Sequence, residues 1–155
     1  MSHDSKLKTI PAIHSVAGYM GIKNAAEAID FYCTAFGAVE ELRLSSPDGK
    51  IGHAKIRIGT SILMMSDEYP DFGALSPVSI GGSPVKFTID TEDADQLFDH
   101  AVSCGCTVLR PVEDQFYGYR TGMVADPYGY SWFIQHKVED LSPEEMQARW
   151  QEIMQ

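Results

Sequence analysis

The feature that most constrains the fold of this chain is an internal repeat. A helical pattern of apolar residues begins at Ala26 and ends at Gly37, and a second one begins at Ala94, 68 positions later, and ends at Gly105. Both patterns stop at a glycine, the residue that most readily adopts the left-handed conformation closing a helix. Asn24, followed three residues later by Glu27, indicates a capping box at the first helix. The repeat predicts two similar modules.

Each predicted helix follows one short β-like run and precedes three more, which gives the pattern βαβββ twice. The fold class is therefore α+β, with modules at about 14–68 and 84–138. A segment rich in Gly, Pro and Ser, residues 69–84, joins the modules. A C-terminal helix at 142–154 is indicated by Ser142 as N-cap, with Pro143 and Glu145 in its first turn. Residues 1–155 are expected to form a single domain.

Charge and hydropathy exclude several classes of partner. The 155-residue chain carries a formal net charge of −10 and has no basic run, so no nucleic-acid partner is expected. Nowhere do 18 apolar residues follow one another, and the first ten residues are not apolar, so no membrane segment is expected and a cytoplasmic location is predicted. Cys33, Cys104 and Cys106 are odd in number and suggest no disulfide framework.

Five segments resemble the vicinal oxygen chelate superfamily, which contains glyoxalase I, bleomycin-resistance proteins and extradiol dioxygenases, and in particular its PhnB-like branch. These segments are AAEAIDFYCTAFGA (25–38), PDGKIGHAKIRIG (47–59), GGSPV (81–85), PVEDQFYGYRTG (111–122) and DPYGYSWFI (126–134). The resemblance implies two curled mixed sheets that form a cup, with helices on the convex side and a ligand on the concave side. It also implies a homodimer.

The resemblance further implies a metal ligand in the first strand of each module and a glutamate in the fourth. The corresponding positions hold Ala17, Leu63, Lys86 and Phe133. Alanine, leucine and phenylalanine have no donor atom, and lysine is normally protonated. The family's usual metal site is therefore expected to be absent and no cofactor is expected, with a divalent metal at a different site left open as the alternative.

Period-two alternation predicts which side chains face the concave side. In the strand at 51–59, Ala54 and Ile56 are expected under the helices, and His53, with Lys55 and Arg57, on the concave side. The ligand-binding candidates from strands and from the loop at 113–120 are Tyr19, His53, Met65, Gln115, Phe116, Tyr119, Arg120 and Phe133.

Two of these candidates have alternative interpretations. His53 can exchange a proton near neutral pH, which makes it the candidate catalytic residue, or it can be a hydrogen-bonded residue of a half-buried sheet. Arg120 can clamp a carboxylate or phosphate of a ligand, or it can pair with one of the chain's own acids.

Two functions remain open at this point. One is a metal-independent protein that binds a small, partly aromatic molecule in the cup, for which the acidic average charge suits a cationic ligand. The other is a lyase, isomerase or dioxygenase with a non-standard site around His53. A third interpretation is a dimeric scaffold whose cavity has lost its use.

Overall fold

The computed structural model describes residues 9–155 and confirms the α+β class and the doubled βαβββ pattern. The first repeat contains β1 (Gly18–Ile22), α2 (Ala25–Phe36), β2 (Val39–Ser45), β3 (Ile51–Ile58) and β4 (Ser61–Asp67). The connecting segment contains η1 (Pro70–Phe72) and α3 (Pro77–Ile80). The second repeat contains β5 (Phe87–Asp90), α4 (Ala94–Cys104), β6 (Thr107–Asp114), β7 (Tyr119–Ala125) and β8 (Ser131–Lys137), and α5 (Pro143–Ile153) follows.

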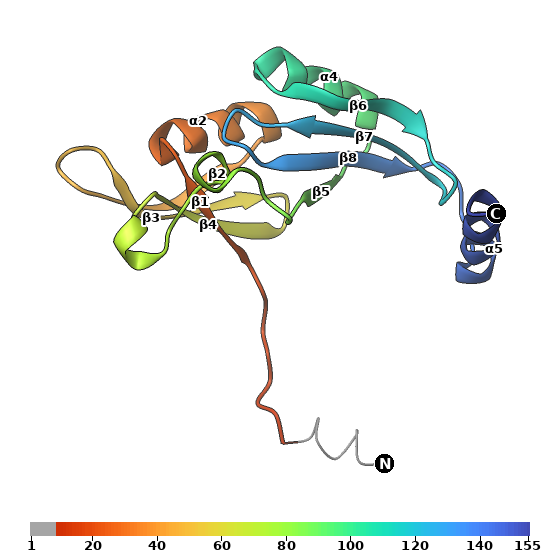
Figure 1. Ribbon diagram of the computed structural model, residues 1–155, viewed down its shortest axis with the longest axis horizontal. Coiled ribbons are helices and arrows are strands. Elements are labelled where there is room, and N and C mark those ends of the chain that lie inside the picture. Colours follow the sequence, from red (N-terminus) through yellow and green to blue (C-terminus); the bar gives the residue numbers. More distant parts are fainter. Residues whose placement is uncertain (1–8) are drawn as a thin grey trace.

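The strands form two separate four-stranded sheets, in the orders β1-β4-β3-β2 and β5-β8-β7-β6. In each sheet the first and fourth strands of the repeat pair in parallel, and the other pairs are antiparallel. Figure 1 shows the sheets next to each other, with α2 and α4 over the same side of both. The sheets do not close onto each other, so one chain presents two open sheet faces on the side away from the helices.

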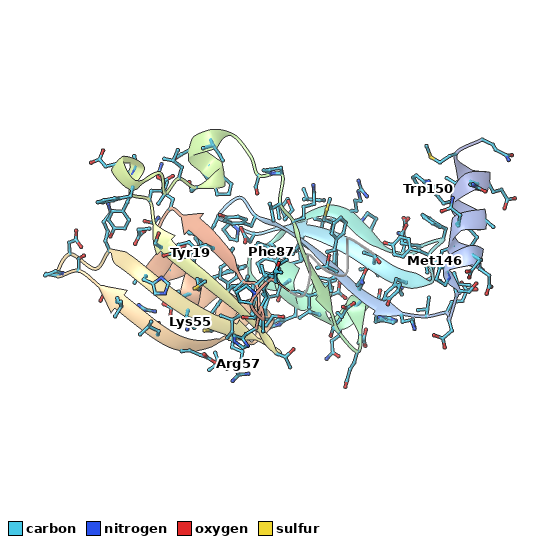
Figure 2. All side chains as sticks on the ribbon, turned by 90° about the horizontal axis from the view of Figure 1, so that it is seen from below. Tyr19, Lys55, Arg57, Phe87, Met146 and Trp150 are labelled. Atoms are coloured by element: carbon cyan, nitrogen blue, oxygen red, sulfur yellow. The ribbon has the colours of Figure 1, made fainter. Side chains whose placement is uncertain are left out.

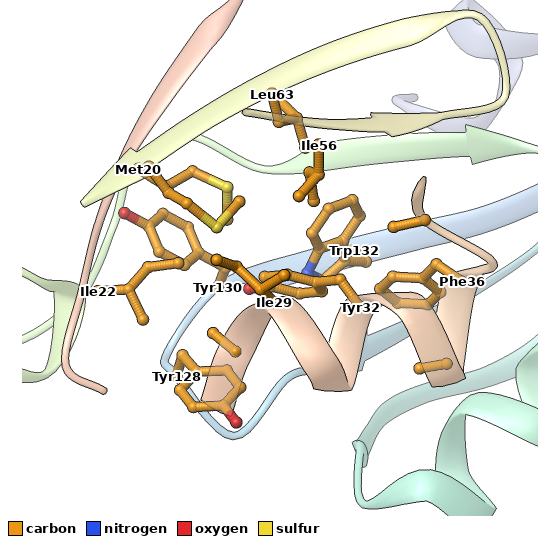
Figure 3. Packing of buried hydrophobic residues seen from close by; sticks show 14 of the residues in the cluster. Met20, Ile22, Ile29, Tyr32, Phe36, Ile56, Leu63, Tyr128, Tyr130 and Trp132 are labelled. Atoms are coloured by element: carbon orange, nitrogen blue, oxygen red, sulfur yellow. The ribbon is translucent and has the colours of Figure 1, made fainter. Parts of the chain in front are cut away.

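The hydrophobic core lies between the helices and the sheets and joins the two repeats (Figure 3). Tyr32 and Phe36 of α2 contact the ring of Trp132 in β8, with ring centroids 5.6 and 4.8 Å from it. Burial of such large aromatic side chains is a main source of folding free energy, about 25 cal/mol for each Å² of apolar surface removed from water. The helix of the first repeat is thus held against a strand of the second.

One buried carboxylate, that of Asp126, connects these aromatic residues. Its Oδ2 accepts hydrogen bonds from the hydroxyl of Tyr32 at 2.5 Å and from Nε1 of Trp132 at 2.9 Å. Its Oδ1 accepts from the backbone N–H groups of Tyr128 and Tyr130 at 2.9 and 3.0 Å. Burial raises the pKa of this carboxyl, although the four donors act in the opposite direction. The DPYG turn therefore supplies a structural anchor.

The predicted helix ends are confirmed in part. Gly37 closes α2 in the left-handed conformation, and Ser142 and Glu145 form both hydrogen bonds of a capping box at α5. The capping box predicted at Asn24 is wrong, because Asn24 itself is left-handed and its side chain makes no cap. The carboxylate of Asp67, at the end of β4, accepts from the N–H of Ala25 instead.

Two further findings bear on the charge and hydropathy analysis. None of the helices between residues 9 and 155 has the length and apolar character needed to cross a bilayer. Cys33, Cys104 and Cys106 are free thiols. Burial raises the pKa of the Cys106 thiol to about 12, so it is an unreactive core residue.

Candidate functional site

The open face of the sheet β1-β4-β3-β2, called here the first open face, combines exposed apolar side chains with cations. Directly paired residues of antiparallel strands share a face, so β2 places Val39, Leu42 and Leu44 opposite Arg57, Lys55 and His53 of β3. Val39, Leu42 and Leu44 are between 38 and 55% exposed. The complete set is Tyr19, Val39, Leu42, Leu44, His53, Lys55, Arg57, Ile62 and Met64.

Tyr19 and His53, both predicted from the sequence, meet on this face. The hydroxyl of Tyr19 lies 2.9 Å from Nδ1 of His53, and the ring centroids are 5.5 Å apart at an interplanar angle of 30°. Tyr19 is 54% exposed, so the pair offers an aromatic surface to solvent. No hydrogen bond within residues 9–155 engages Nε2 of His53, which leaves that nitrogen available to a ligand.

Figure 2 shows Lys55 and Arg57 on the same side of the sheet as Tyr19. Arg57 is already engaged, with Nε 3.1 Å from a carboxylate oxygen of Glu41 and Nη1 donating to the carbonyl of Gly59 at 3.1 Å. Lys55 is half-buried, and within residues 9–155 its ammonium has neither a hydrogen bond nor an ion pair. The first open face therefore carries one neutralised cation and one available cation.

The open face of the sheet β5-β8-β7-β6, called here the second open face, has a different chemistry. It contains Thr88, Tyr119, Thr121, Met123, Phe133 and Gln135, so the predicted candidates Tyr119 and Phe133 lie on it. The hydroxyls of Tyr117 and Thr121 are 3.3 Å apart, and Thr121 donates to Gln135 at 3.4 Å. Gln135 in turn donates to Asp90 at 2.9 Å. These polar groups satisfy one another.

The predicted position of Met65 on the concave side is wrong. Met65 is fully buried, because it pairs directly with Ala54 and shares the helix-covered face with it. Leu63 and Asp67 follow the same alternation and are also buried. The methionine on the first open face is its neighbour Met64, which pairs with Lys55.

The loop residues predicted with them do not join Tyr19 and His53. Phe116 stacks on Trp150 of α5 with ring centroids 5.7 Å apart, and its carbonyl accepts from Arg149 at 3.0 Å. The backbone N–H of Gln115 donates to the carbonyl of Tyr119 at 2.7 Å, closing the loop. Phe116 also borders a shallow hollow of about 480 Å³ beside α5. Phe116 thus holds the C-terminal helix, while Gln115 closes its own loop.

Arg120 lies on the helix-covered side of its sheet and pairs with acids of the chain, as the alternative interpretation held. Its Nε and Nη2 donate to the two carboxylate oxygens of Asp95 at 2.7 and 3.0 Å. Its Nη1 donates to Asp114 at 3.1 Å. The pKa of Arg120 is raised, chiefly by the hydrogen bonds to Asp95 and Asp114. The guanidinium is thus committed inside the chain.

The residues at the positions of the expected metal ligands do not fit a divalent cation. Of the four positions named above, Ala17 and Lys86 precede β1 and β5, Leu63 is buried on the helix-covered face, and Phe133 lies on the second open face. Where the first and fourth strands meet on the open faces, the neighbouring pairs are Tyr19 with Met64 and Thr88 with Phe133. None of these pairs supplies the imidazole or carboxylate donors that divalent cations prefer. Between residues 9 and 155, no three His, Cys, Asp or Glu side chains lie close enough together to hold a metal ion.

Comparison with known proteins identifies the family. Residues 12–134 match the model of the Glyoxalase/Bleomycin resistance protein/Dioxygenase superfamily. The chain belongs to this superfamily. Uncharacterized protein Mb0911c of Mycobacterium bovis is 39% identical over 137 residues, which cover 86% of this chain and 90% of the relative.

Solved structures of low sequence identity share the fold. Protein PA1353 from Pseudomonas aeruginosa superposes with a TM-score of 0.65 at 22% identity, covering 81% of this chain and 98% of its own. TnmS3, an antibiotic binding protein from Streptomyces sp. CB03234, superposes with a TM-score of 0.62 at 18% identity. That match covers 83% of this chain and 98% of TnmS3.

The sequence contained a signal that would have placed the residues of β4 on the correct faces, although alternation within β4 alone did not. Gly59 and Thr60 form a two-residue connection between β3 and β4, which pairs Ile58 with Ser61. Counting back from that pair places Met65 beside Ala54, and therefore under the helices. The same counting places Ile62 and Met64 on the open face.

Proposed function

We propose that this protein binds a small, partly aromatic molecule on its open sheet faces without the metal chemistry of its superfamily. The observation that carries the proposal is the first open face, where the rings of Tyr19 and His53 contact each other beside exposed Leu42 and Leu44. Binding sites for small molecules are mainly apolar and aromatic, with few polar groups that fix orientation. Phe133 and Tyr119 would extend this surface on the second open face.

A second copy of the chain would close the site. Soluble proteins rarely leave a large apolar surface uncovered, and a sheet face with Leu44 at 55% and Tyr19 at 54% exposure is suited to contact with a partner. A homodimer is therefore part of the proposal, as are a single domain built of both repeats, a cytoplasmic location and a place in the PhnB-like branch. The description of TnmS3 as an antibiotic binding protein agrees with a binding role on this fold.

The alternative is a lyase, isomerase or dioxygenase centred on His53. It is favoured by one observation, the contact between Nδ1 of His53 and the Tyr19 hydroxyl, since a histidine oriented by a second group is an arrangement suited to proton transfer. Metal content tests the metal-dependent form of this alternative. Stoichiometric zinc, nickel, manganese or iron that disappears in His53→Ala would support the enzyme.

The binding proposal is tested by a thermal-shift screen of planar aromatic compounds, followed by titration of the compounds that raise the melting temperature. In Tyr19→Ala we expect affinity to fall roughly fivefold, because one aromatic contact contributes about 1 kcal/mol. The matched control is Phe72→Ala, which removes an aromatic side chain that is 88% exposed on η1. The proposal would be contradicted if affinity fell equally in both variants, or if it did not change in Tyr19→Ala.

A further inference from the structure

The chemical class of the ligand follows from the charges on the first open face. Five of the cationic side chains within residues 9–155 form ion pairs with acids of the chain: Arg43, Arg57, Arg120, Lys137 and Arg149. Lys55 is different, because it is half-buried among apolar side chains and has no acidic partner in that part of the chain. The chain has 22 acidic residues against 12 lysines and arginines, so the missing acidic partner of Lys55 is not explained by a shortage of acids.

The neighbours of Lys55 define its surroundings. It lies between Leu42 of β2 and Met64 of β4 on the two adjacent strands, and His53 precedes it by two residues on the same face. Side chains two residues apart on a strand project side by side, about 7 Å from each other. The ammonium of Lys55 and the free Nε2 of His53 are thus two neighbouring polar groups beside the apolar side chains of Leu42, Leu44 and Met64.

A half-buried lysine can bury its aliphatic stem and keep its ammonium in water, where an opposite charge on a ligand can bind it through a charge-assisted contact. Arg57, the next residue on this face, does not need a ligand, because Glu41 already neutralises it. An acidic group bound at Lys55 would satisfy the ammonium and lie within reach of His53. An apolar or aromatic body attached to that group would cover Leu42, Leu44 and Met64.

From this arrangement we infer that the ligand is an aromatic or apolar anion, whose carboxylate, sulfonate or phosphate group binds Lys55. This inference rests on the proposed binding function and specifies its ligand. The negative net charge of the chain led to the expectation of a cationic ligand. An anionic ligand is inferred instead, because the local charge on the first open face is positive. A local charge at contact distance outweighs a dispersed average that salt screens within about 8–10 Å.

Two fluorescent probes that share one aromatic body test the inference. The first is 8-anilinonaphthalene-1-sulfonate, an anion, and the second is N-phenyl-1-naphthylamine, its neutral counterpart. We expect the anion to bind the intact protein about tenfold more tightly, as one charge-assisted contact predicts. The preference should weaken between 50 mM and 500 mM salt.

Variants assign the effect to one residue. Lys55→Met keeps an unbranched stem of similar length and removes the charge, so it should abolish the preference for the anion while the neutral probe still binds. Lys86→Met is the matched control, because Lys86 is an exposed lysine just before β5, outside the first open face. Near-ultraviolet circular dichroism confirms that each variant keeps its tertiary packing.

The outcomes separate the two proposals. If both probes bind equally, or if Lys55→Met keeps the preference, the anionic ligand is refuted while the binding function stands. If neither probe binds, the apolar face does not bind ligands of this kind, and both proposals fail. A preference lost in Lys55→Met and kept in Lys86→Met supports the anionic ligand.

Discussion

The carboxylate of Asp126 should be the most sensitive single group in the core. It is 5% exposed and accepts four hydrogen bonds, two of them from the fully buried Tyr32 and the 2% exposed Trp132. Asp126→Ala would leave four donors without an acceptor, at a cost of at least about 1 kcal/mol each. We expect a loss of about 4 kcal/mol from an unfolding free energy that is typically 5–15 kcal/mol.

Asp126→Asn is the graded comparison, because it keeps the shape of the side chain. Its oxygen can still accept from the backbone N–H groups of Tyr128 and Tyr130, and the Tyr32 hydroxyl can rotate to accept from the new amide. The indole N–H of Trp132 cannot reverse its role and would face another donor. We expect a loss of about 2 kcal/mol, which is the cost of that one unsatisfied pair.

The assay is equilibrium unfolding in urea, followed by tryptophan fluorescence. Trp132 is buried and Trp150 is 46% exposed, so the change in emission on unfolding reports mainly the environment of Trp132. An unchanged dependence on urea concentration would show that the variants differ in stability and not in the extent of unfolding. A loss below 1 kcal/mol in Asp126→Ala would refute the view that these four hydrogen bonds hold the repeats together.

Comparison of the wild type with Asp126→Asn gives the contribution of Asp126 to the pH dependence of stability. Burial raises the pKa of Asp126 in the folded state, so its protonated form is favoured there. The stability linked to this proton is complete below the usual pKa of about 3.9 and is lost as the pH rises through the folded value. Asparagine does not titrate, so the stability of the wild type relative to Asp126→Asn should fall as the pH increases from about 4. A rise over this interval would show that the hydrogen bonds outweigh burial.

Three further changes have clear expectations. Gly21→Ala should prevent stable folding at 37 °C, as judged by circular dichroism, because the new Cβ would lie 2.2 Å from the backbone oxygen of Leu75. Asp67→Ala should lower the unfolding free energy by about 2 kcal/mol in urea titrations, because two backbone N–H groups, at 3.0 and 2.6 Å, lose their acceptor. Arg120→Met should change the unfolding free energy little, since its ion pair with Asp95 is partly exposed, and should leave probe binding unchanged. Weaker binding of the anionic probe in this variant would show that Arg120 does contact the ligand.

Most of the fold could be predicted because each module carries complete local signals. Helix periodicity, the glycines that end the helices and the alternation in β3 act within a few residues of each other. Placement of the strand β4 failed for a different reason. A strand has two equivalent faces, and only its register against β3 decides whether Met64 or Met65 meets solvent.

The site was less predictable, because the contacts that remove residues from it are distant in sequence. Arg120 is occupied by Asp95, 25 residues away, and Phe116 by Trp150 on the C-terminal helix. Nothing near either residue in the sequence indicates these partners. The contact between Tyr19 and His53 joins β1 to β3 across the intervening strand β4, and it depends on the sheet order and on the register, which aligns Tyr19 with Met64 and Lys55.

The two repeats agree where they build the scaffold and differ where they face solvent. At the start of α2 the N–H of Ala25 donates to Asp67, and at the start of α4 the N–H of Ala94 donates to Nδ1 of His136 at 2.8 Å. In both repeats the acceptor therefore lies near the end of the fourth strand, but it is a carboxylate in the first repeat and an imidazole in the second. The open faces have no such correspondence, because the first carries exposed apolar side chains around an unpaired lysine, whereas the second combines Met123 and Phe133 with polar groups that hydrogen-bond to one another. A ligand that uses both would be held by its acidic group on the first face and by ring contacts on the second, so removing Lys55 should change which ligands bind, while removing Phe133 should weaken binding of all of them.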